Sequence, residues 1–182
     1  MIPDLFTSRL LLRPISLDDA QNMFNMNADP AVVRYTGNKG YKNIAEVVEF
    51  ISTYDQYEKY KQGRMTILDK STGEYIGWCG LKFLEDINET DLGYRLLQKY
   101  WGKGIATESS IAVLDYGFLT LGLKRIVGRV VQENISSLNV LKKLGMKFEK
   151  KFEAHGYQCE QYFLEGQMWQ EHREKLIEKK FD

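Results

Sequence analysis

The sequence predicts a single α+β domain over residues 1–182, with a mixed sheet and flanking helices. Two helical patterns and three strand patterns separated by turns fill the first half of the chain. A strand, a helix and another strand follow in that order, which makes a parallel crossover. A chain of 182 residues is also long enough to bury one sizeable core.

The N-terminal region predicts a strand followed by a helix. Residues 8–15 read SRLLLRPI, an apolar run that is typical of a strand. Ser16, Asp18 and Asp19 follow, and residues of these types cap a helix and complement its dipole. Because the next residues carry apolar groups at helical spacing, we expect a helix to begin here.

A second helix is predicted over residues 44–61, after a loop at 29–41. Asn43 stands where it can cap the first turn. Five apolar side chains fall on one helical face, namely Val47, Phe50, Ile51, Tyr54 and Tyr57. The pattern is that of an amphipathic helix with one buried face.

Three strand patterns come next, at residues 65–70, 75–85 and 90–97. The stretch STGE separates the first two, and DINE separates the last two. Because consecutive strands joined by short turns pair with each other, these residues predict an antiparallel meander.

The parallel crossover occupies the segment after the meander. Residues 106–122 have helical spacing and end at a glycine, and residues 124–131 read as a buried strand. Residues 136–145 then predict a helix closed by Gly145.

The last elements are a hairpin and a terminal helix. The strands at 147–154 and 157–165 meet at His155-Gly156, which suits a tight hairpin turn. Residues 167–180 predict a charged helix, which we expect to fray.

Composition argues against several classes of protein. Twenty-five basic and 25 acidic residues give a formal charge of zero, so nothing indicates a nucleic-acid or membrane-surface partner. No uncharged apolar run approaches the roughly 20 residues of a membrane helix, and the first fifteen residues do not resemble a signal peptide. Cys79 and Cys159 lie far apart in a chain with two histidines, which disfavours a zinc cluster or a disulfide framework. We expect a metal-free protein of the reducing cytoplasm.

The stretch YWGKGIATES, residues 100–109, raises the question of what its two glycines are for. Gly102 and Gly104 permit positive φ and a close approach to a ligand, just before a helix that begins near Ala106 or Thr107. Unpaired N–H groups and the helix dipole would attract an anion there, and Lys103 would add charge. The alternative is a tight strand-to-helix turn that binds nothing. Neither GxxxxGK[ST] nor GxGxxG is present.

A second motif thirty residues later favours the anion site over the tight turn. WGKGIATESS together with NISSLNVLKKLGM resembles the acetyl-CoA-binding core of the GCN5-related N-acetyltransferases (GNAT), most closely their RimJ/RimL-like branch. The family signature is Arg or Gln, two residues, Gly, one residue, then Gly or Ala, and residues 101–106 match it except that Trp101 replaces Arg or Gln. Asn134 and Ser137 match its N-x-x-S element, and Leu144-Gly145-Met146 matches the following GF with Met for Phe.

The resemblance covers nearly the whole chain, because residues 8–20 resemble the family's first strand and helix. It implies a strongly twisted mixed sheet of about six to seven strands with helices on both faces. Two central strands, at about 90–97 and 124–131, would splay apart, and the first of them resembles the bulged central strand of the branch.

By the same resemblance, acetyl-CoA would lie in the gap between the splayed strands. Its pyrophosphate would rest on the amides of Gly102 to Thr107, its pantetheine would pair with the strand edge, and the N-x-x-S residues would face the pantetheine arm. The residues expected to contact acetyl-CoA are Leu96, Leu97, Trp101, Gly102, Lys103, Gly104, Ile105, Ala106, Thr107, Asn134 and Ser137.

The resemblance also implies that the acceptor amine attacks the thioester directly, so neither cysteine needs a role. An amide of the splayed strand would stabilise the charge that develops on the carbonyl oxygen. Many relatives place a tyrosine seven residues after the motif asparagine, where it protonates the departing thiolate, but this chain has Leu141 there. Water or Ser137 would then suffice, because a thiol pKa of about 8.5 lies close to neutral pH.

Two carboxylates are candidates for the base that accepts the proton of the amine. Asp91 lies on the strand where relatives often carry Glu, and Glu160 lies on the late strand that lines the acceptor cleft. Tyr35 and Tyr162 would line the same cleft. The alternatives are that Asp91 is a solvated edge charge, that Glu160 pairs with a lysine, and that the tyrosines only pack.

Three functions therefore stay open: an N-acetyltransferase, a non-catalytic acyl-CoA binder, and a nucleotide-binding α/β domain. The third would need strict βαβ alternation, which the meander interrupts. Relatives acetylate protein N-termini, polyamines, aminoglycosides and small amines, and we expect an α-amine of a peptide or small molecule to be a better acceptor than a lysine ε-amine. A homodimer is compatible with the exposed late strands.

Overall fold

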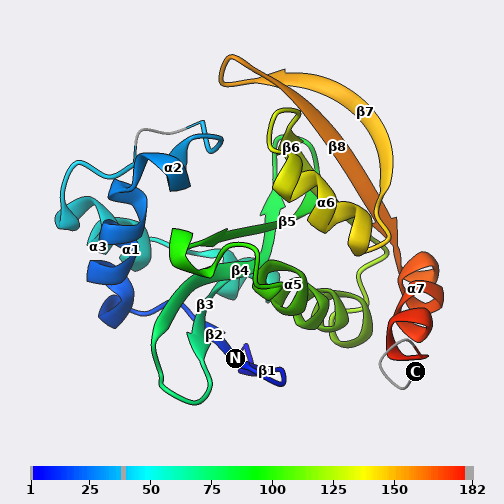
Figure 1. The fold of residues 1–182 in the computed structure, drawn as a ribbon, viewed down its shortest axis with the longest axis horizontal. Helices are drawn as coiled ribbons and strands as arrows, with labels where there is room; N and C mark the ends of the chain where they lie inside the picture. Colours follow the sequence, from blue (N-terminus) through cyan, green and yellow to red (C-terminus); the bar gives the residue numbers. More distant parts are fainter. Residues whose placement is uncertain (1, 38–39, 179–182) are drawn as a thin grey trace.

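The computed structural model describes residues 2–37 and 40–178, and its framework is one eight-stranded mixed sheet (Figure 1). The strand order is β1-β2-β3-β4-β5-β6-β8-β7, and β5–β6 is the parallel pair. The strands are β1 (Leu5–Phe6), β2 (Leu10–Pro14), β3 (Arg64–Asp69), β4 (Tyr75–Leu84), β5 (Glu89–Leu96), β6 (Arg125–Val131), β7 (Lys147–Ala154) and β8 (Tyr157–Glu165).

Helices cover both faces of the sheet, as the sequence predicts. They are α1 (Ala20–Ala28), α2 (Pro30–Val33), α3 (Ile44–Ser52), α4 (Gln56–Tyr60), α5 (Ile105–Asp115), α6 (Ile135–Lys143) and α7 (Gly166–Glu178). Ile67 and Leu68 are neighbours in β3 and point to opposite faces, so the first joins the apolar cluster that contains α5 and α6, and the second packs on the cluster of α1 to α3. Figure 1 shows these two groups of helices as separate parts of the molecule.

The predicted meander, crossover and hairpin are all present, and the structure adds the two-residue strand β1. The helix predicted over 44–61 is broken, because α3 ends at Ser52 and α4 begins at Gln56. Two tyrosine hydroxyls, one within the break and one in α4, bind backbone groups at the ends of β2 and β3. Tyr54 accepts a hydrogen bond from the Arg64 N–H at 2.8 Å, and Tyr57 accepts one from the Ile15 N–H at 2.8 Å. Contacts with the sheet therefore override the local helical pattern.

The terminal helix is better anchored than its charge suggests. Trp169 in the first turn of α7 is fully buried in the larger apolar cluster, and its indole N–H donates to Asp115 Oδ1 at 2.9 Å. One large side chain therefore holds the first turn of this helix to α5, and residues 179–180 of the predicted helix lie outside the described residues.

The two central strands splay apart. β5 pairs with β4 without interruption from Leu96↔Gly77 to Glu89↔Leu84, but it pairs with β6 at Asp91↔Val127. Beyond that point the parallel strands diverge toward their carboxyl ends. The bulge expected in β5 is not found in its pairing with β4, and the irregularities lie in the β3–β4 and β7–β8 ladders instead.

Candidate active site

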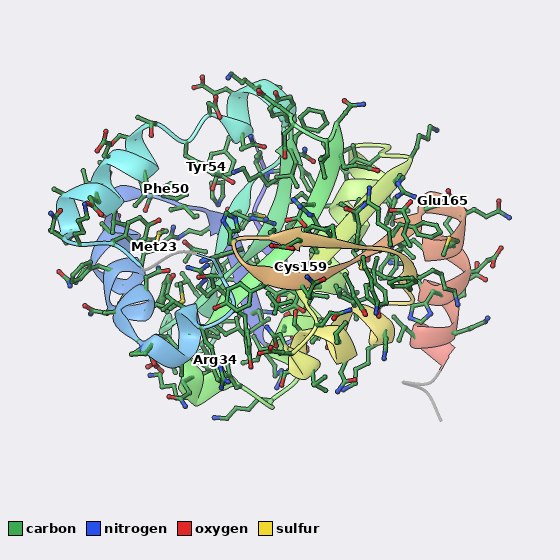
Figure 2. All side chains as sticks on the ribbon, turned by 90° about the horizontal axis from the view of Figure 1, so that it is seen from above. Met23, Arg34, Phe50, Tyr54, Cys159 and Glu165 are labelled. Atoms are coloured by element: carbon green, nitrogen blue, oxygen red, sulfur yellow. The ribbon has the colours of Figure 1, made fainter. Side chains whose placement is uncertain are left out.

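A cleft of about 320 Å³ lies where β5 and β6 diverge, and residues from both faces of the sheet line it. Asp91 and Arg95 reach it from one face of β5, while Tyr94 reaches it from the other. The β7–β8 hairpin lies across this region, as Figure 2 shows with Cys159 on the hairpin. Near the hairpin turn, the Tyr157 hydroxyl donates to the Arg34 carbonyl at 2.9 Å, which ties the hairpin to the segment after α2. The cleft therefore passes through the sheet and is partly covered.

The glycine loop stands directly before the start of α5. Gly102 and Gly104 have φ of 72° and 76°, and Gly104 directly precedes the first helical residue. A Cβ on Gly102 would meet no atom within 4 Å, and on Gly104 it would approach Arg9 Nη2 at 3.8 Å. The first helical N–H groups have no intrahelical partner, so free donors face unfilled space. These residues fit a pyrophosphate group.

Arg9 holds this loop from a distant part of the chain. Its guanidinium donates to the Lys103 carbonyl at 3.1 Å and to Glu108 of α5 at 2.7 Å. Arg9 was not predicted as a functional residue, because nothing local in the sequence indicates a partner more than 90 residues away. Arg9 is therefore a positioning residue for the loop.

The expected pantetheine edge of β5 is already partly occupied by the protein. The Trp101 indole N–H donates to the Leu96 carbonyl at 2.9 Å, and the Leu97 N–H donates to the Ile76 carbonyl at 2.9 Å. Since backbone groups alternate along a strand, the Leu96 N–H points away from β4 and toward the gap. Trp101 thus orients the loop against the strand that precedes it.

The N-x-x-S motif serves both the helix and the cleft. Asn134 caps α6, with its Oδ1 accepting the Ser137 N–H at 3.1 Å. Ser137 Oγ lies 2.7 Å from the Tyr94 hydroxyl, and both residues line the cleft together with Leu141. Burial raises the pKa of Tyr94 far above its ordinary value, so this hydroxyl stays protonated. Tyr94 was not anticipated, although alternation places it on the α6 face with Leu92 and Leu96.

Asp91 lies in the cleft and is not a solvated edge charge. Its side chain is 13% exposed, and Oδ2 is 2.5 Å from Nη2 of Arg64 on β3. Burial raises the pKa of Asp91, and the positive charge of Arg64 opposes this shift in part. The result is a carboxylate that is held in place and titrates above its ordinary range.

Glu160 and Tyr162 lie elsewhere. They alternate along β8 with Tyr157 and Cys159, which do line the cleft, so they point to the opposite face. The Tyr162 hydroxyl donates to Glu160 at 2.9 Å, and neither residue is among the described residues that line the cleft. Glu160 also accepts from Gln132 at 3.0 Å instead of pairing with a lysine. From the sequence we expected Glu160 in the cleft, but the residue before it on the strand, Cys159, lies there instead.

The remaining wall of the cleft combines aromatic and arginine side chains. Tyr35 lies in it, as the sequence analysis expected. Trp78, Arg95 and Arg129 were not anticipated. A usable signal existed for Arg129, because it is the one charged residue within the apolar run IVGRVV of the β6 strand. Among the described residues, no group of three or more His, Cys, Asp or Glu side chains could hold a metal ion.

In the part of the chain that the structure describes, no helix has both the length and the apolar character needed to cross a membrane.

Comparisons with known proteins identify the family and the fold of the chain. Residues 9–147 match the family model described as acetyltransferase (GNAT) domain. The chain is 33% identical over 147 residues to p20, an uncharacterized N-acetyltransferase of Bacillus licheniformis, which covers 80% of this chain and 83% of that protein. It is 27% identical over 165 residues to the spermidine N(1)-acetyltransferase of Escherichia coli (strain K12), covering 86% and 79% respectively.

A solved structure supports the same relationship. The crystal structure of the acetyltransferase from Agrobacterium tumefaciens str. C58 matches with a TM-score of 0.79 at 26% identity, over 90% of this chain and 95% of that one.

Proposed function

The chain belongs to the acetyltransferase (GNAT) family as an acetyl-CoA-dependent N-acetyltransferase, and from that premise we propose that its acceptor is a primary amine, either a peptide N-terminal α-amine or a small amine. We also propose that it is a RimJ/RimL-like member of the family. The sequence motifs at 101–106 and 134–137 support that assignment.

One observation carries the proposal for the site: the cleft passes through the sheet at the splay. On the α6 face it meets Tyr94, Asn134 and Ser137. On the other face it meets Asp91. A cofactor arm on the first face and an amine on the second would therefore meet between β5 and β6.

When bound, acetyl-CoA supplies a thioester carbonyl that a neutral amine attacks directly and a thiol that leaves. The glycine loop binds the pyrophosphate through the first N–H groups of α5. The Leu96 N–H faces the gap and can bind the pantetheine arm. These roles need no side chain chemistry, which explains why a short backbone motif encodes them.

Asp91 is the proposed general base. A carboxylate with a raised pKa is a better proton acceptor at neutral pH than an ordinary one, and Arg64 holds it in one orientation. It takes the proton from the acceptor amine, directly or through one water molecule.

Tyr94 and Ser137 are proposed to act on the departing sulphur. Their oxygens are 2.7 Å apart, and the hydroxyl of Tyr94 stays protonated across the working pH range. Together they can donate a hydrogen bond to the thiolate and deliver a proton to it. Tyr94 would thus replace the tyrosine whose usual position holds Leu141.

A thiol-release assay with acetyl-CoA and a panel of amines and short peptides tests the proposal. We expect release to depend on an amine and to fall at least a hundredfold in Asp91→Asn, while Asp18→Asn, an exposed carboxylate on another element, behaves as wild type. Acetyl-CoA affinity measured by isothermal titration separates the alternatives. Binding without release for any amine would identify a non-catalytic acyl-CoA binder instead.

A further inference from the structure

The acceptor side of the cleft carries more positive than negative charge. Three guanidinium groups line it, from Arg64 on β3, Arg95 on β5 and Arg129 on β6, against the single carboxylate of Asp91 among the described lining residues. The whole chain has zero formal charge, so this excess is local. Asp91 pairs with Arg64 at 2.5 Å, and the positive charge of Arg129 also acts on it, so one carboxylate faces three guanidinium groups among the described lining residues.

Arg95 is held in place without an ion pair. Its Nη1 donates to the Asn27 side-chain oxygen, and its guanidinium lies 5.5 Å from the centre of the Trp78 ring. Burial lowers the pKa of Arg95, and the nearby Arg64 charge adds to this effect. Among the described residues no carboxylate lies within ion-pair distance of it. The fold therefore keeps a desolvated cation at this position, supported only by neutral groups.

The side chain of Arg129 has a buried N–H group that makes no hydrogen bond to the described residues. Its guanidinium lies 4.3 Å from the centre of the Phe152 ring, which fixes the plane of the group. The Nε atom is buried and has no hydrogen-bond partner among the described residues. A buried N–H without a partner costs free energy, and a ligand oxygen in the cleft would remove that cost.

Flat guanidinium groups stacked on aromatic rings present their N–H edges in a fixed geometry that suits carboxylate and phosphate oxygens. A polycationic acceptor would instead place its ammonium groups beside Arg95 and Arg129. The volume of about 320 Å³ is in the range of small-molecule sites. The guanidinium groups and the volume of the cleft thus favour a small anionic acceptor over a polyamine.

We propose that the acceptor is a small amine carrying an anionic group, which Arg95 and Arg129 bind while its amine faces Asp91. This inference rests on the proposed N-acetyltransferase function and names its substrate class. The anionic group is a carboxylate or a phosphate, since both fit the same donors.

Matched acceptors test the charge requirement and distinguish the two anions. Leucine is compared with leucinamide, and O-phosphoethanolamine with ethanolamine, with spermidine as the cationic case. Values of kcat/KM are expressed per concentration of neutral amine, because an anionic neighbour changes the pKa of the amine. We expect at least a tenfold preference for the anionic member of one pair over its partner and over spermidine. Preference for the neutral amines or for spermidine would overturn the inference.

Two variants link that preference to the arginines. In Arg95→Gln and Arg129→Gln the preference for the anionic acceptor should fall at least tenfold, with acetyl-CoA affinity within twofold of wild type. Arg173→Gln removes a cation on α7 that pairs with Asp115 outside the cleft, so it should retain the preference. An unchanged preference in both cleft variants would contradict the assignment.

A binding measurement keeps this inference separate from the proposed function. N-acetylleucine, N-acetylleucinamide and N-acetyl-O-phosphoethanolamine are titrated into protein saturated with CoA, in wild type and in Arg95→Gln. Tighter binding of an anionic probe, lost in the variant, supports the anion site even if no amine is acetylated, in which case only the proposed function fails. Equal binding of charged and neutral probes would refute the anion site even if acetylation occurs.

Discussion

The two faces of β5 differ in the kind of group that forms each proposed site, backbone on one face and side chains on the other. On the α5 and α6 side, the features proposed for acetyl-CoA are backbone conformations: two glycines with positive φ, a helix start and a capped helix. On the other side, the features proposed for the acceptor are side chains from six strands, β3 to β8, held by contacts between residues distant in sequence. A local motif can encode the first kind of site, whereas the second depends on the whole fold.

The largest expected effect lies on the acceptor side. Asp91→Asn should lower kcat at least a hundredfold, because a positioned base contributes on the order of 10² or more to the rate. A base must be deprotonated, so wild-type kcat should fall as pH drops through the raised pKa of Asp91, above the ordinary value of about 3.9. The pH profile of kcat checks this. A similar acidic limb in Asp91→Asn would assign the titration to another group.

Gly104→Val should weaken acetyl-CoA binding at least tenfold. Its φ of 76° is costly for a β-branched residue, and the new side chain would enter the space next to the helix start. Gly73→Val is the matched control, since Gly73 has φ of 73° and no atom within 4 Å of an added Cβ, but lies in the β3–β4 turn. Equal affinities for acetyl-CoA in a folded Gly104→Val protein and in this control would contradict the placement of the pyrophosphate.

The next effect concerns the nucleophile. At pH 7 an α-amine with a pKa of about 7.8 is roughly a tenth deprotonated, against a few parts in ten thousand for a lysine at about 10.4. The higher intrinsic reactivity of the more basic amine offsets part of this gap. We expect a peptide with a free N-terminus and no lysine to exceed an N-blocked, lysine-containing peptide severalfold in kcat/KM at pH 7. The reverse order would mean that the cleft activates lysine strongly.

The smallest expected effect concerns the proposed role of Tyr94 as the proton donor to the departing thiolate. Leu141 occupies the position where many relatives carry that tyrosine. Tyr94→Phe should lower kcat a fewfold, because the hydroxyl beside Ser137 is lost, and should not move the basic limb of the pH profile, because this hydroxyl stays protonated across the working range. Leu141→Ala should leave that limb in place while lowering stability by about 2–5 kcal/mol, since Leu141 is buried against Gly128. Loss of the limb in Leu141→Ala alone would show that the motif is misaligned.

The sequence was most informative where structure is local. The glycine loop, the Asn43 cap and the His155-Gly156 turn each follow from residues within a few positions of one another, and each lies where it was predicted. The break between α3 and α4 did not follow, because tyrosine contacts with strands cause it.

Side-chain direction was the main source of error in the candidate site. Glu160 was expected in the cleft from its strand alone, yet a period of two places Cys159 there instead. Arg64, Arg95 and Arg129 come together from three strands, and their meeting depends on the register of the sheet. No local pattern predicts that register between distant segments.

The most direct test of this separation between faces is acetyl-CoA affinity, measured by isothermal titration for Gly104→Val and Arg95→Gln side by side. The account predicts at least a tenfold loss in Gly104→Val and less than a twofold change in Arg95→Gln. A comparable loss in Arg95→Gln, or none in a folded Gly104→Val, would contradict the claim that backbone on one face binds the cofactor while side chains on the other select the acceptor.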